Sequence, residues 1–470
     1  MKTLAKESEG LKIKRKMPQG FFWGNSVSSM QTEGAWNIDG KGPSVYDVRP
    51  ATANTSDWTT AIDEYHRYEE DLDLLKAMNM NMYRIQISWS RVNPTGDGDF
   101  NAAGIAYYDR LVDAMLQRGI TPMICLYHFD MPLALAKKEN GFISRKTVVA
   151  FVRFAKKIID HFAERVKYWL TFNEQNLYFT STAFRISGYL KGKRTLTEMY
   201  TIFHHTILAH AMITDYLHQK YPALKIGGMT AYTGVYPASC NPHDIMAVRK
   251  LQEFQYDNLN EIFANGHYSP EVLQFIHEKQ LDCDLKAADL ALIAATKVDF
   301  LAFSYYRSEV LSASKLSAET PPNLYAETAT VDNQFLQAND WGWTIDPLGF
   351  RNILTMLYNR YQLPVFPVEN GIGLRESWNG EDMIADEQRI AYHREHIKAL
   401  KDAIFIDGAK VLGYLGWGLI DIPSSQGDME KRYGAVYVDR GNHELRTLQR
   451  VPKKSFYWFK SLLEKNGDEL

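Results

Sequence analysis

The sequence predicts one α/β domain in which parallel strands and their helices close into a (β/α)8 barrel. Short β-rich segments alternate with amphipathic helical segments through most of the 470 residues, and such alternation is typical of a parallel sheet covered by helices. Two acidic motifs, Asn173-Glu174 and Glu369-Asn370, each follow a short apolar run. That is where a barrel strand passes into a loop and where catalytic groups of this fold lie.

Eight segments have the length and composition of buried strands, and eight is the number that closes this type of barrel. In chain order they are Phe21–Gly24, Met82–Ile87, Pro122–Leu126, Tyr168–Phe172, Lys225–Met229, Asp299–Ser304, Val365–Val368 and Val411–Trp417. Helical periodicity predicts helices between them, most clearly over Thr59–Met78, Arg145–Phe162 and Leu196–Lys220.

The stretch Ser308–Asn339 follows the sixth predicted strand and has only weak periodicity. It is long for a connection without secondary structure, which indicates either an active-site loop or a plain surface insertion. Residues 1–18 are predicted to form a polar N-terminal arm of the same single domain, which spans residues 1–470.

The charge balance argues against several classes of protein. With 53 basic and 56 acidic side chains, the chain lacks the electrostatic footprint of a nucleic-acid-binding protein. The first ten residues carry charges where a signal peptide needs an apolar stretch, and no apolar run reaches the roughly 18 residues of a membrane span. We therefore expect a cytoplasmic protein that binds neither nucleic acid nor membrane; its oligomeric state is not predicted.

We also expect neither a metal ion nor a cofactor. Cys125, Cys240 and Cys283 are widely spaced and odd in number, which indicates neither a disulfide framework nor a zinc site. Gly371-Ile-Gly373 lacks the remaining glycine and the following helix of a dinucleotide fingerprint.

A pair of carboxylates suits the hydrolysis of a glycosidic bond. One group protonates the leaving oxygen while the other attacks or stabilises the sugar carbon. A separation of about 5–5.5 Å makes the second carboxylate a nucleophile and retains the configuration, whereas about 6.5–9.5 Å admits a water and inverts it. The residues alone leave both outcomes open.

Further motifs give the chain its resemblance to the glycoside hydrolases of family 1, from about Phe21 to the segment 453–459. They are Phe-Phe-Trp-Gly-Asn-Ser at 21–26, Gln31-Thr32-Glu33-Gly34, Tyr83-Arg84, Trp89-Ser90-Arg91, Leu-Tyr-His-Phe-Asp-Met-Pro at 126–132, Phe303-Ser304-Tyr305-Tyr306 and Asp340-Trp341-Gly342-Trp343. The resemblance implies a (β/α)8 barrel with Glu174 as acid/base, Glu369 as nucleophile and retention of configuration.

The same resemblance implies roles for the neighbours of these two residues. Arg84 and Tyr306 occupy the family positions that stabilise the Glu369 carboxylate, and Asn173 would bind the sugar 2-hydroxyl. Further substrate contacts are implied for Gln31 and His128, which match positions that hold ring hydroxyls, and for the aromatic rings of Trp343 and Trp417.

The segment from Ser424 to Gly434 indicates which sugar the site would accept. Family members that act on unmodified glucosides usually carry a glutamate where this chain has Ser424. A 6-phosphate, with about −1.5 to −2 charges near pH 7, is repelled by a glutamate and held by hydroxyl and ammonium groups. Ser424, Lys431 and Tyr433 offer such groups, and their spacing resembles the phosphate signature of the 6-phospho-β-glycosidase branch. Lys431 and Tyr433 would share one face of an extended segment, with Arg432 on the other.

Ser425 replaces the bulky tryptophan that galactoside-preferring members of this branch tend to carry, which implies room for an equatorial 4-hydroxyl. The resemblance therefore implies a retaining 6-phospho-β-glucosidase for small substrates such as cellobiose 6-phosphate or aryl β-glucoside 6-phosphates.

One alternative is a 6-phospho-β-galactosidase or an enzyme of dual specificity. Another is a non-catalytic sugar-phosphate-binding barrel, although such proteins commonly lose one glutamate and both are present here.

The chain departs from the family pattern at a few positions near the predicted site. They are Asn25, Gln86, Pro367 and Ile422-Pro423. Pro367 lies inside the seventh predicted strand, where it removes a backbone donor from the ladder. We expect these positions to alter how Glu369 and Ser424 are presented.

Overall fold

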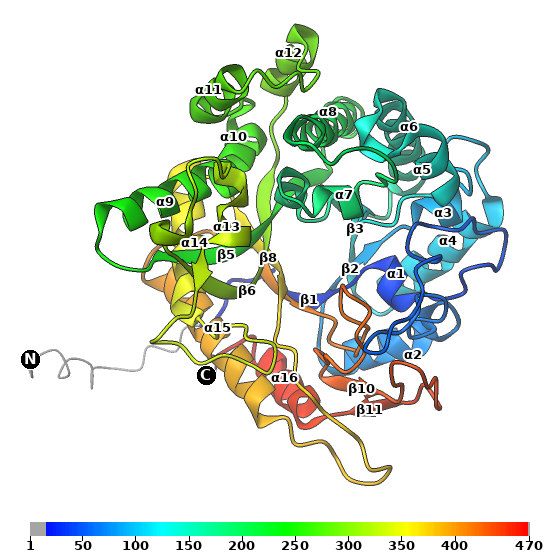
Figure 1. Cartoon of the computed structure of the whole chain (residues 1–470). Coiled ribbons are helices and arrows are strands. Elements are labelled where there is room, and N and C mark those ends of the chain that lie inside the picture. Colours follow the sequence, from blue (N-terminus) through cyan, green and yellow to red (C-terminus); the bar gives the residue numbers. More distant parts are fainter. Residues whose placement is uncertain (1–15, 469–470) are drawn as a thin grey trace, which may run out of the picture.

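The computed structural model describes residues 16–468, and within them eight parallel strands form the wall of a (β/α)8 barrel (Figure 1). The barrel strands are β1 (Phe22–Ser26), β2 (Met82–Gln86), β3 (Thr121–Tyr127), β4 (Tyr168–Phe172), β5 (Lys225–Pro237), β6 (Phe300–Leu311), β8 (Val365–Asn370) and β9 (Gly413–Trp417). Strands β1 to β6 pair in chain order, β6 pairs with β8, and β9 pairs with β1. A bridge between Val365 and Val411 closes the barrel. All eight predicted strands are confirmed.

Helices surround the strands, as Figure 1 shows. The longer ones are α2 (Glu64–Ala77), α4 (Ala102–Gln117), α6 (Arg145–Phe162), α8 (Leu196–Lys220), α9 (Pro242–Gln252), α10 (Asn258–Asn265), α11 (Pro270–Glu278), α12 (Ala287–Ala295), α14 (Pro347–Tyr361), α15 (Glu387–Phe405) and α16 (Lys454–Glu464). Helix α8 begins with a capping box in which Thr195 and Glu198 each accept a backbone N–H of the other. The predicted helices Arg145–Phe162 and Leu196–Lys220 are confirmed.

Short elements complete the connections. The short helices are α1 (Ser29–Thr32), α3 (Trp89–Val92), α5 (Leu133–Glu139), α7 (Ala183–Ile186) and α13 (Tyr325–Thr328). Single turns are η1 (Gly141–Ile143), η2 (Gln175–Phe179), the π-helical η3 (Glu253–Asp257), η4 (Ala313–Lys315) and η5 (Pro322–Leu324). Strand β7 (Thr330–Val331) pairs antiparallel with β6, and β10 (Val436–Val438) pairs antiparallel with β11 (Arg450–Pro452).

Two predicted boundaries were wrong, the start of the helix predicted from Thr59 and the end of the sixth strand. Helix α2 begins at Glu64 and not at Thr59, because Ala61 and Asp63 have φ values of 49° and 58°, which a right-handed helix excludes. The segment Ser308–Asn339 is not structureless, since β6 continues to Leu311 against β5 and is followed by η4, η5, α13 and β7.

Most of the predicted N-terminal arm, residues 1–15, lies outside the described part of the chain. Met17 is buried, and its backbone N–H donates to the carbonyl of Asn466. Met17 therefore packs into the core, and the polar arm itself stays a prediction.

The barrel interior is filled by apolar side chains that point inward from the strands. This inner cluster comprises Met82, Met123, Cys125, Leu170, Met229, Phe300, Ala302, Phe366, Val368 and Leu415, all buried. Because strand side chains alternate between the two faces, Arg84 and Gln86 lie on the same inward face as Met82, closer to the carboxyl end of β2. The inner cluster thus forms an apolar floor, and the polar side chains of Arg84 and Gln86 lie above it, toward the carboxyl ends of the strands.

An irregularity in β8 sets the direction of Glu369. In the β6–β8 ladder Phe303 pairs with Pro367, but the next residue of β6, Ser304, pairs with Glu369, so Val368 is an extra residue. Such a bulge shifts the alternation of side chains by one. Glu369 consequently lies on the inward face, opposite Ser304, instead of pointing toward the outer helices. Pro367 has no N–H for the ladder, which suits it to this bulge.

No helix in the described part of the chain combines the length and the apolar character that a membrane crossing requires.

We predict that Phe366→Ala lowers the free energy of unfolding by about 3–5 kcal/mol, because it opens a cavity inside the closed barrel. Phe366 is fully buried between the rings of Phe22 and Phe300. Urea unfolding followed by tryptophan fluorescence measures the change. The matched control is Phe335→Ala, at a side chain that is 93% exposed, for which we expect a change below about 0.5 kcal/mol. Equal effects of the two substitutions would contradict the packing described here.

Candidate active site

Glu369 lies at the carboxyl end of β8 and is held by donors from two other strands. Arg84 of β2 donates from Nη1 to Oε1 over 2.5 Å, and Tyr306 of β6 donates its hydroxyl to Oε2 over 2.8 Å. The guanidinium of Arg84 is completely buried. It also donates from Nη2 to Oδ1 of Asn173 over 2.5 Å and from Nη1 to Oγ of Ser26 over 2.9 Å. Arg84 therefore connects β1, β2, β4 and β8.

Glu174 follows β4 in the left-handed backbone conformation, with φ 43° and ψ 56°. Its Oε1 accepts a hydrogen bond of 2.5 Å from Oγ of Ser304, the residue opposite Glu369 in the β6–β8 ladder. Its neighbour Asn173 is bound to Arg84, the residue that also binds Glu369. The structure therefore brings the two predicted catalytic glutamates to one place.

The surroundings of the two carboxyl groups act differently on their pKa values. Burial, and then the negative charge of Glu369, raise the pKa of Glu174 to about 8. Burial also raises the pKa of Glu369, but the charge of Arg84 and the hydrogen bond from Tyr306 oppose that effect. Glu369 therefore ionises first, and its charge keeps a proton on Glu174 at neutral pH. A protonated and an ionised carboxyl group then coexist in one site.

His128 and Gln31, the two residues predicted to bind ring hydroxyls, differ in whether their polar atoms are free to bind a sugar. His128 is buried 5.6 Å from the ring of Trp417, centroid to centroid, and its Nδ1 has no hydrogen-bond partner. Burial lowers its pKa well below the usual range, so the imidazole is neutral. Gln31 is different, because its Nε2 donates to the carbonyl of Pro423 and its Oε1 accepts from Ser28. A sugar hydroxyl would have to share these atoms, and its contact with Gln31 stays a prediction.

An aromatic wall adjoins Glu369. The ring of Tyr306 lies 5.7 Å from that of Trp343 and 6.1 Å from that of Tyr433. Tyr433 is buried, whereas Trp343 is half-buried. Both rings were predicted to contact substrate, and the structure places them next to the residue that binds Glu369.

Lys431 places an ammonium group against this wall. Its Nζ lies 3.3 Å from the ring centroid of Trp343 and 5.8 Å from that of Tyr433. The residue is only 6% exposed, and within residues 16–468 its Nζ makes no ion pair or hydrogen bond. Burial and the charge of Arg307 lower its pKa to about 8. Arg432 points the other way, as predicted, and pairs with Asp421 at 3.1 Å.

The two predicted serines lie in different surroundings. Ser424 is buried, and its Oγ accepts from the backbone N–H groups of Gln426 and Asp428 at 3.4 and 3.2 Å. Its hydroxyl hydrogen has no acceptor among the described residues, so it remains available to a ligand. Ser425 is exposed and, with Gln426, lines a cavity of about 720 Å³.

Sequence reasoning missed several residues of the site. Ser304 binds Glu174, Trp341 lies 5.3 Å from Nζ of Lys431, and the guanidinium carbon of Arg307 lies 5.0 Å from the ring of Trp343. The alternation of β6 could have indicated Ser304, since it lies two residues before Tyr306 and faces inward with it. Arg307 carries no such signal, and it pairs with Glu309 at 2.5 Å.

The departures from the family pattern have local structural roles. Asn25 accepts the backbone N–H of Leu419 over 2.8 Å, and Gln86 accepts that of Ser29 over 3.1 Å. The carbonyl of Pro423 receives the amide of Gln31. These positions tie together the loops that follow β1, β2 and β9 around the site.

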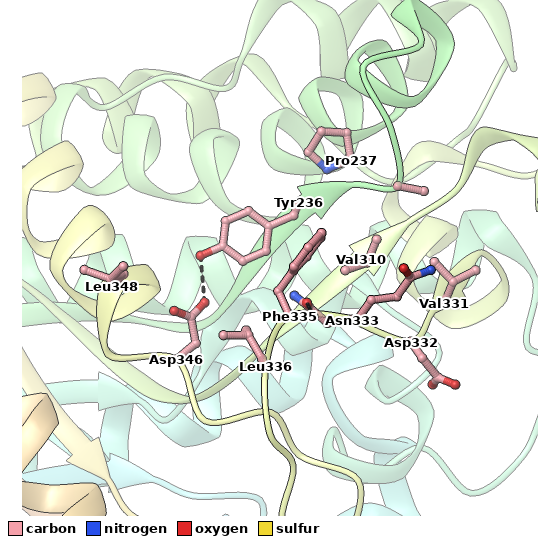
Figure 2. A pocket seen from close by; sticks show the side chains of 12 residues that line it. Tyr236, Pro237, Val310, Val331, Asp332, Asn333, Phe335, Leu336, Asp346 and Leu348 are labelled. Atoms are coloured by element: carbon pink, nitrogen blue, oxygen red, sulfur yellow. Dashed lines mark hydrogen bonds between the residues drawn. The ribbon is translucent and has the colours of Figure 1, made fainter. Parts of the chain in front are cut away.

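Another cavity, of about 900 Å³, is lined by none of the predicted site residues (Figure 2). Tyr236, Phe335 and Leu348 contribute to its lining. Tyr236 donates to Asp346 over 2.7 Å, the contact drawn as a dashed line in Figure 2. Among the described residues, no group of three or more His, Cys, Asp or Glu side chains is placed to hold a metal ion.

Comparison with known proteins agrees with this geometry. The family model described as glycosyl hydrolase family 1 matches residues 13–468. An aryl-phospho-β-D-glucosidase of Bacillus subtilis is 36% identical over 97% of this chain and 99% of its own length. A phospho-cellobiase of Klebsiella oxytoca is 37% identical over 96% of this chain and 99% of its own length.

Solved structures match the fold as well. A family 1 β-glucosidase from Thermotoga maritima superposes with a TM-score of 0.86 at 29% identity, covering 97% of this chain and 100% of that one. The match extends over the whole barrel. With its paired glutamates at the carboxyl ends of β4 and β8, the chain belongs to glycosyl hydrolase family 1.

Proposed function

We propose that the protein is a retaining 6-phospho-β-glucosidase, which hydrolyses small 6-phosphorylated β-glucosides to glucose 6-phosphate and the aglycone or sugar. The observation that carries this proposal is the buried ammonium of Lys431, which forms no ion pair or hydrogen bond with a carboxylate among the described residues, although the charge of Asp428 acts on it from farther away. Burying an unpaired charge is costly. A bound phosphate would supply the missing partner, together with the hydroxyl groups of Ser424 and Tyr433.

Names of relatives support the same substrate class. The Bacillus subtilis relative is an aryl-phospho-β-D-glucosidase and the Klebsiella oxytoca relative is a phospho-cellobiase. Both names describe β-glucosides that carry a phosphate. A phosphorylated sugar crosses a lipid bilayer poorly because its charges would lose their hydration, which supports a cytoplasmic site of action.

In the proposed mechanism, the carboxylate of Glu369 attacks the anomeric carbon while Glu174 gives its proton to the leaving oxygen. A covalent glycosyl-enzyme forms and the aglycone departs. Glu174, now ionised, removes a proton from water, which attacks the same carbon and releases Glu369. Retention follows from the two successive inversions.

The electrostatics of the site support this division of roles. Arg84 and Tyr306 stabilise the charge on Glu369 before attack, and Glu174 keeps its proton because that charge is close. Once Glu369 is esterified its charge is lost, so the pKa of Glu174 falls and the residue can act as a base. Asn173, held by Arg84, would bind the 2-hydroxyl of the sugar.

Specificity for the gluco configuration belongs to the same proposal and rests on the small side chain of Ser425. A strong preference for the 4-epimer phosphate would instead identify a 6-phospho-β-galactosidase, and similar rates would indicate dual specificity. A non-catalytic sugar-phosphate-binding barrel is disfavoured by the intact pair of glutamates.

We predict that the enzyme hydrolyses 4-nitrophenyl β-D-glucoside 6-phosphate far faster than the same glucoside without its phosphate. Lys431→Gln should lower kcat/KM for the phosphorylated substrate about 10- to 150-fold, because a hydrogen bond to a charged group is lost. Ser424→Glu should lower it further by adding repulsion. The matched control is Lys297→Gln, at an exposed lysine. Equal rates on both glucosides would refute the phosphate proposal and favour a plain β-glucosidase.

We predict a pH profile with an alkaline fall. A general acid works only while protonated, so kcat/KM for phenyl β-D-glucoside 6-phosphate should fall as pH rises past about 8, the pKa of Glu174 in the free enzyme. With a 2,4-dinitrophenyl substrate, whose leaving group needs no proton, kcat/KM should show no such fall in either the wild type or Glu174→Gln. The Lys431→Arg variant keeps the positive charge, so its rate on the phenyl substrate should still fall at alkaline pH. A fall of unchanged midpoint in Glu174→Gln would assign the acid to another group.

A further inference from the structure

A basic cavity shares Ser425 with the predicted site, and none of its lining residues takes part in the catalytic steps above. It has a volume of about 720 Å³ and is lined by three arginines, Arg49, Arg185 and Arg194. Aromatic side chains, Trp58, Phe184 and Tyr189, also contribute to its lining.

The three guanidinium groups have no carboxylate partner within the described part of the chain. Arg49 donates to the backbone carbonyl of Arg185 over 3.0 Å and stacks on Tyr46 at 3.7 Å. Arg185 donates to the neutral amide of Gln426 over 2.8 Å. Arg194 is exposed. The cavity is therefore positively charged and its cations are not neutralised by the protein.

Nearby carboxylates are engaged elsewhere. Glu327 accepts the backbone N–H of Ser181, which also lines the cavity, over 2.9 Å. Glu198 accepts from the hydroxyl of Tyr189 over 2.9 Å and from the backbone of Thr195 in the capping box of α8. Neither forms an ion pair with the three arginines.

The cavity lies near Glu174 and near the loop that carries Ser424. Arg185 lies on α7, in the segment that follows Glu174 through η2, and its positive charge partly opposes the rise in the pKa of Glu174. Ser425 and Gln426 bound the cavity from the loop that carries Ser424. Since Glu174 would protonate the leaving oxygen, the aglycone must extend past Glu174.

We propose that this cavity binds an aromatic aglycone that carries a carboxylate. The inference rests on the proposed hydrolase function and specifies its substrate. The aromatic side chains offer faces for an aryl ring, and arginine forms bidentate hydrogen bonds with carboxylates. Lys431, which would bind the 6-phosphate, is not part of the cavity lining, so the three arginines are available to a second anionic group of the substrate.

The test compares two 6-phospho-β-D-glucosides with nearly the same leaving group, 4-methylumbelliferone and its 4-carboxymethyl analogue. We expect the wild-type kcat/KM to favour the carboxylate about three- to tenfold, the range for a charged hydrogen bond at a partly exposed site. The double variant Arg185→Gln/Arg194→Gln should bring this ratio close to one. Lys193→Gln, an exposed lysine outside the cavity lining, should leave it unchanged.

A wild-type ratio of one or less would overturn the proposal, as would a ratio that persists in the double variant. Because the ratio compares two substrates on one enzyme, a general loss of folded protein cancels out. The same ratio can be measured on the unphosphorylated pair. If those compounds are the better substrates, the 6-phosphate proposal fails while the carboxylate proposal is still decided by the ratio.

Discussion

The site depends on one buried cation, the guanidinium of Arg84. It lies above the apolar floor of the barrel and donates to side chains from three other strands or their ends, Ser26, Asn173 and Glu369. A buried guanidinium without these acceptors would carry a large desolvation cost. The hydrogen bonds that offset this cost also fix the positions of both acidic motifs, so fold stability and the electrostatics of the site come from the same contacts.

A second constraint is the bulge in β8. The pairing of Ser304 with Glu369, after Phe303 with Pro367, turns the carboxylate into the barrel, where Arg84 and Tyr306 reach it. Ser304 faces the same space and binds Glu174. Ser304 and Glu369, paired in one ladder, thus bring the two acidic groups together. Pro367 lies inside the strand and is compatible with that geometry.

The sequence predicted the eight strands and the convergence of the glutamates, because strand composition and loop motifs are local signals. It did not predict the start of α2, which depends on the left-handed residues Ala61 and Asp63. It also missed the continuation of β6 through Ser308–Leu311, which depends on pairing with β5, a contact between distant segments. The arginine cavity could not be predicted for the same reason, since its lining comes from loops after β1, β4 and β9.

The central claim is that Glu369 is the nucleophile of a double displacement. Its most direct test is mass spectrometry after incubation with 2,4-dinitrophenyl 2-deoxy-2-fluoro-β-D-glucoside 6-phosphate, whose 2-fluoro group slows breakdown of the glycosyl-enzyme. We predict that one fluoroglucosyl phosphate is added per chain and that it is located on the peptide containing Glu369. An unlabelled enzyme that still releases dinitrophenol at a steady rate, or a label on Glu174, would contradict this account.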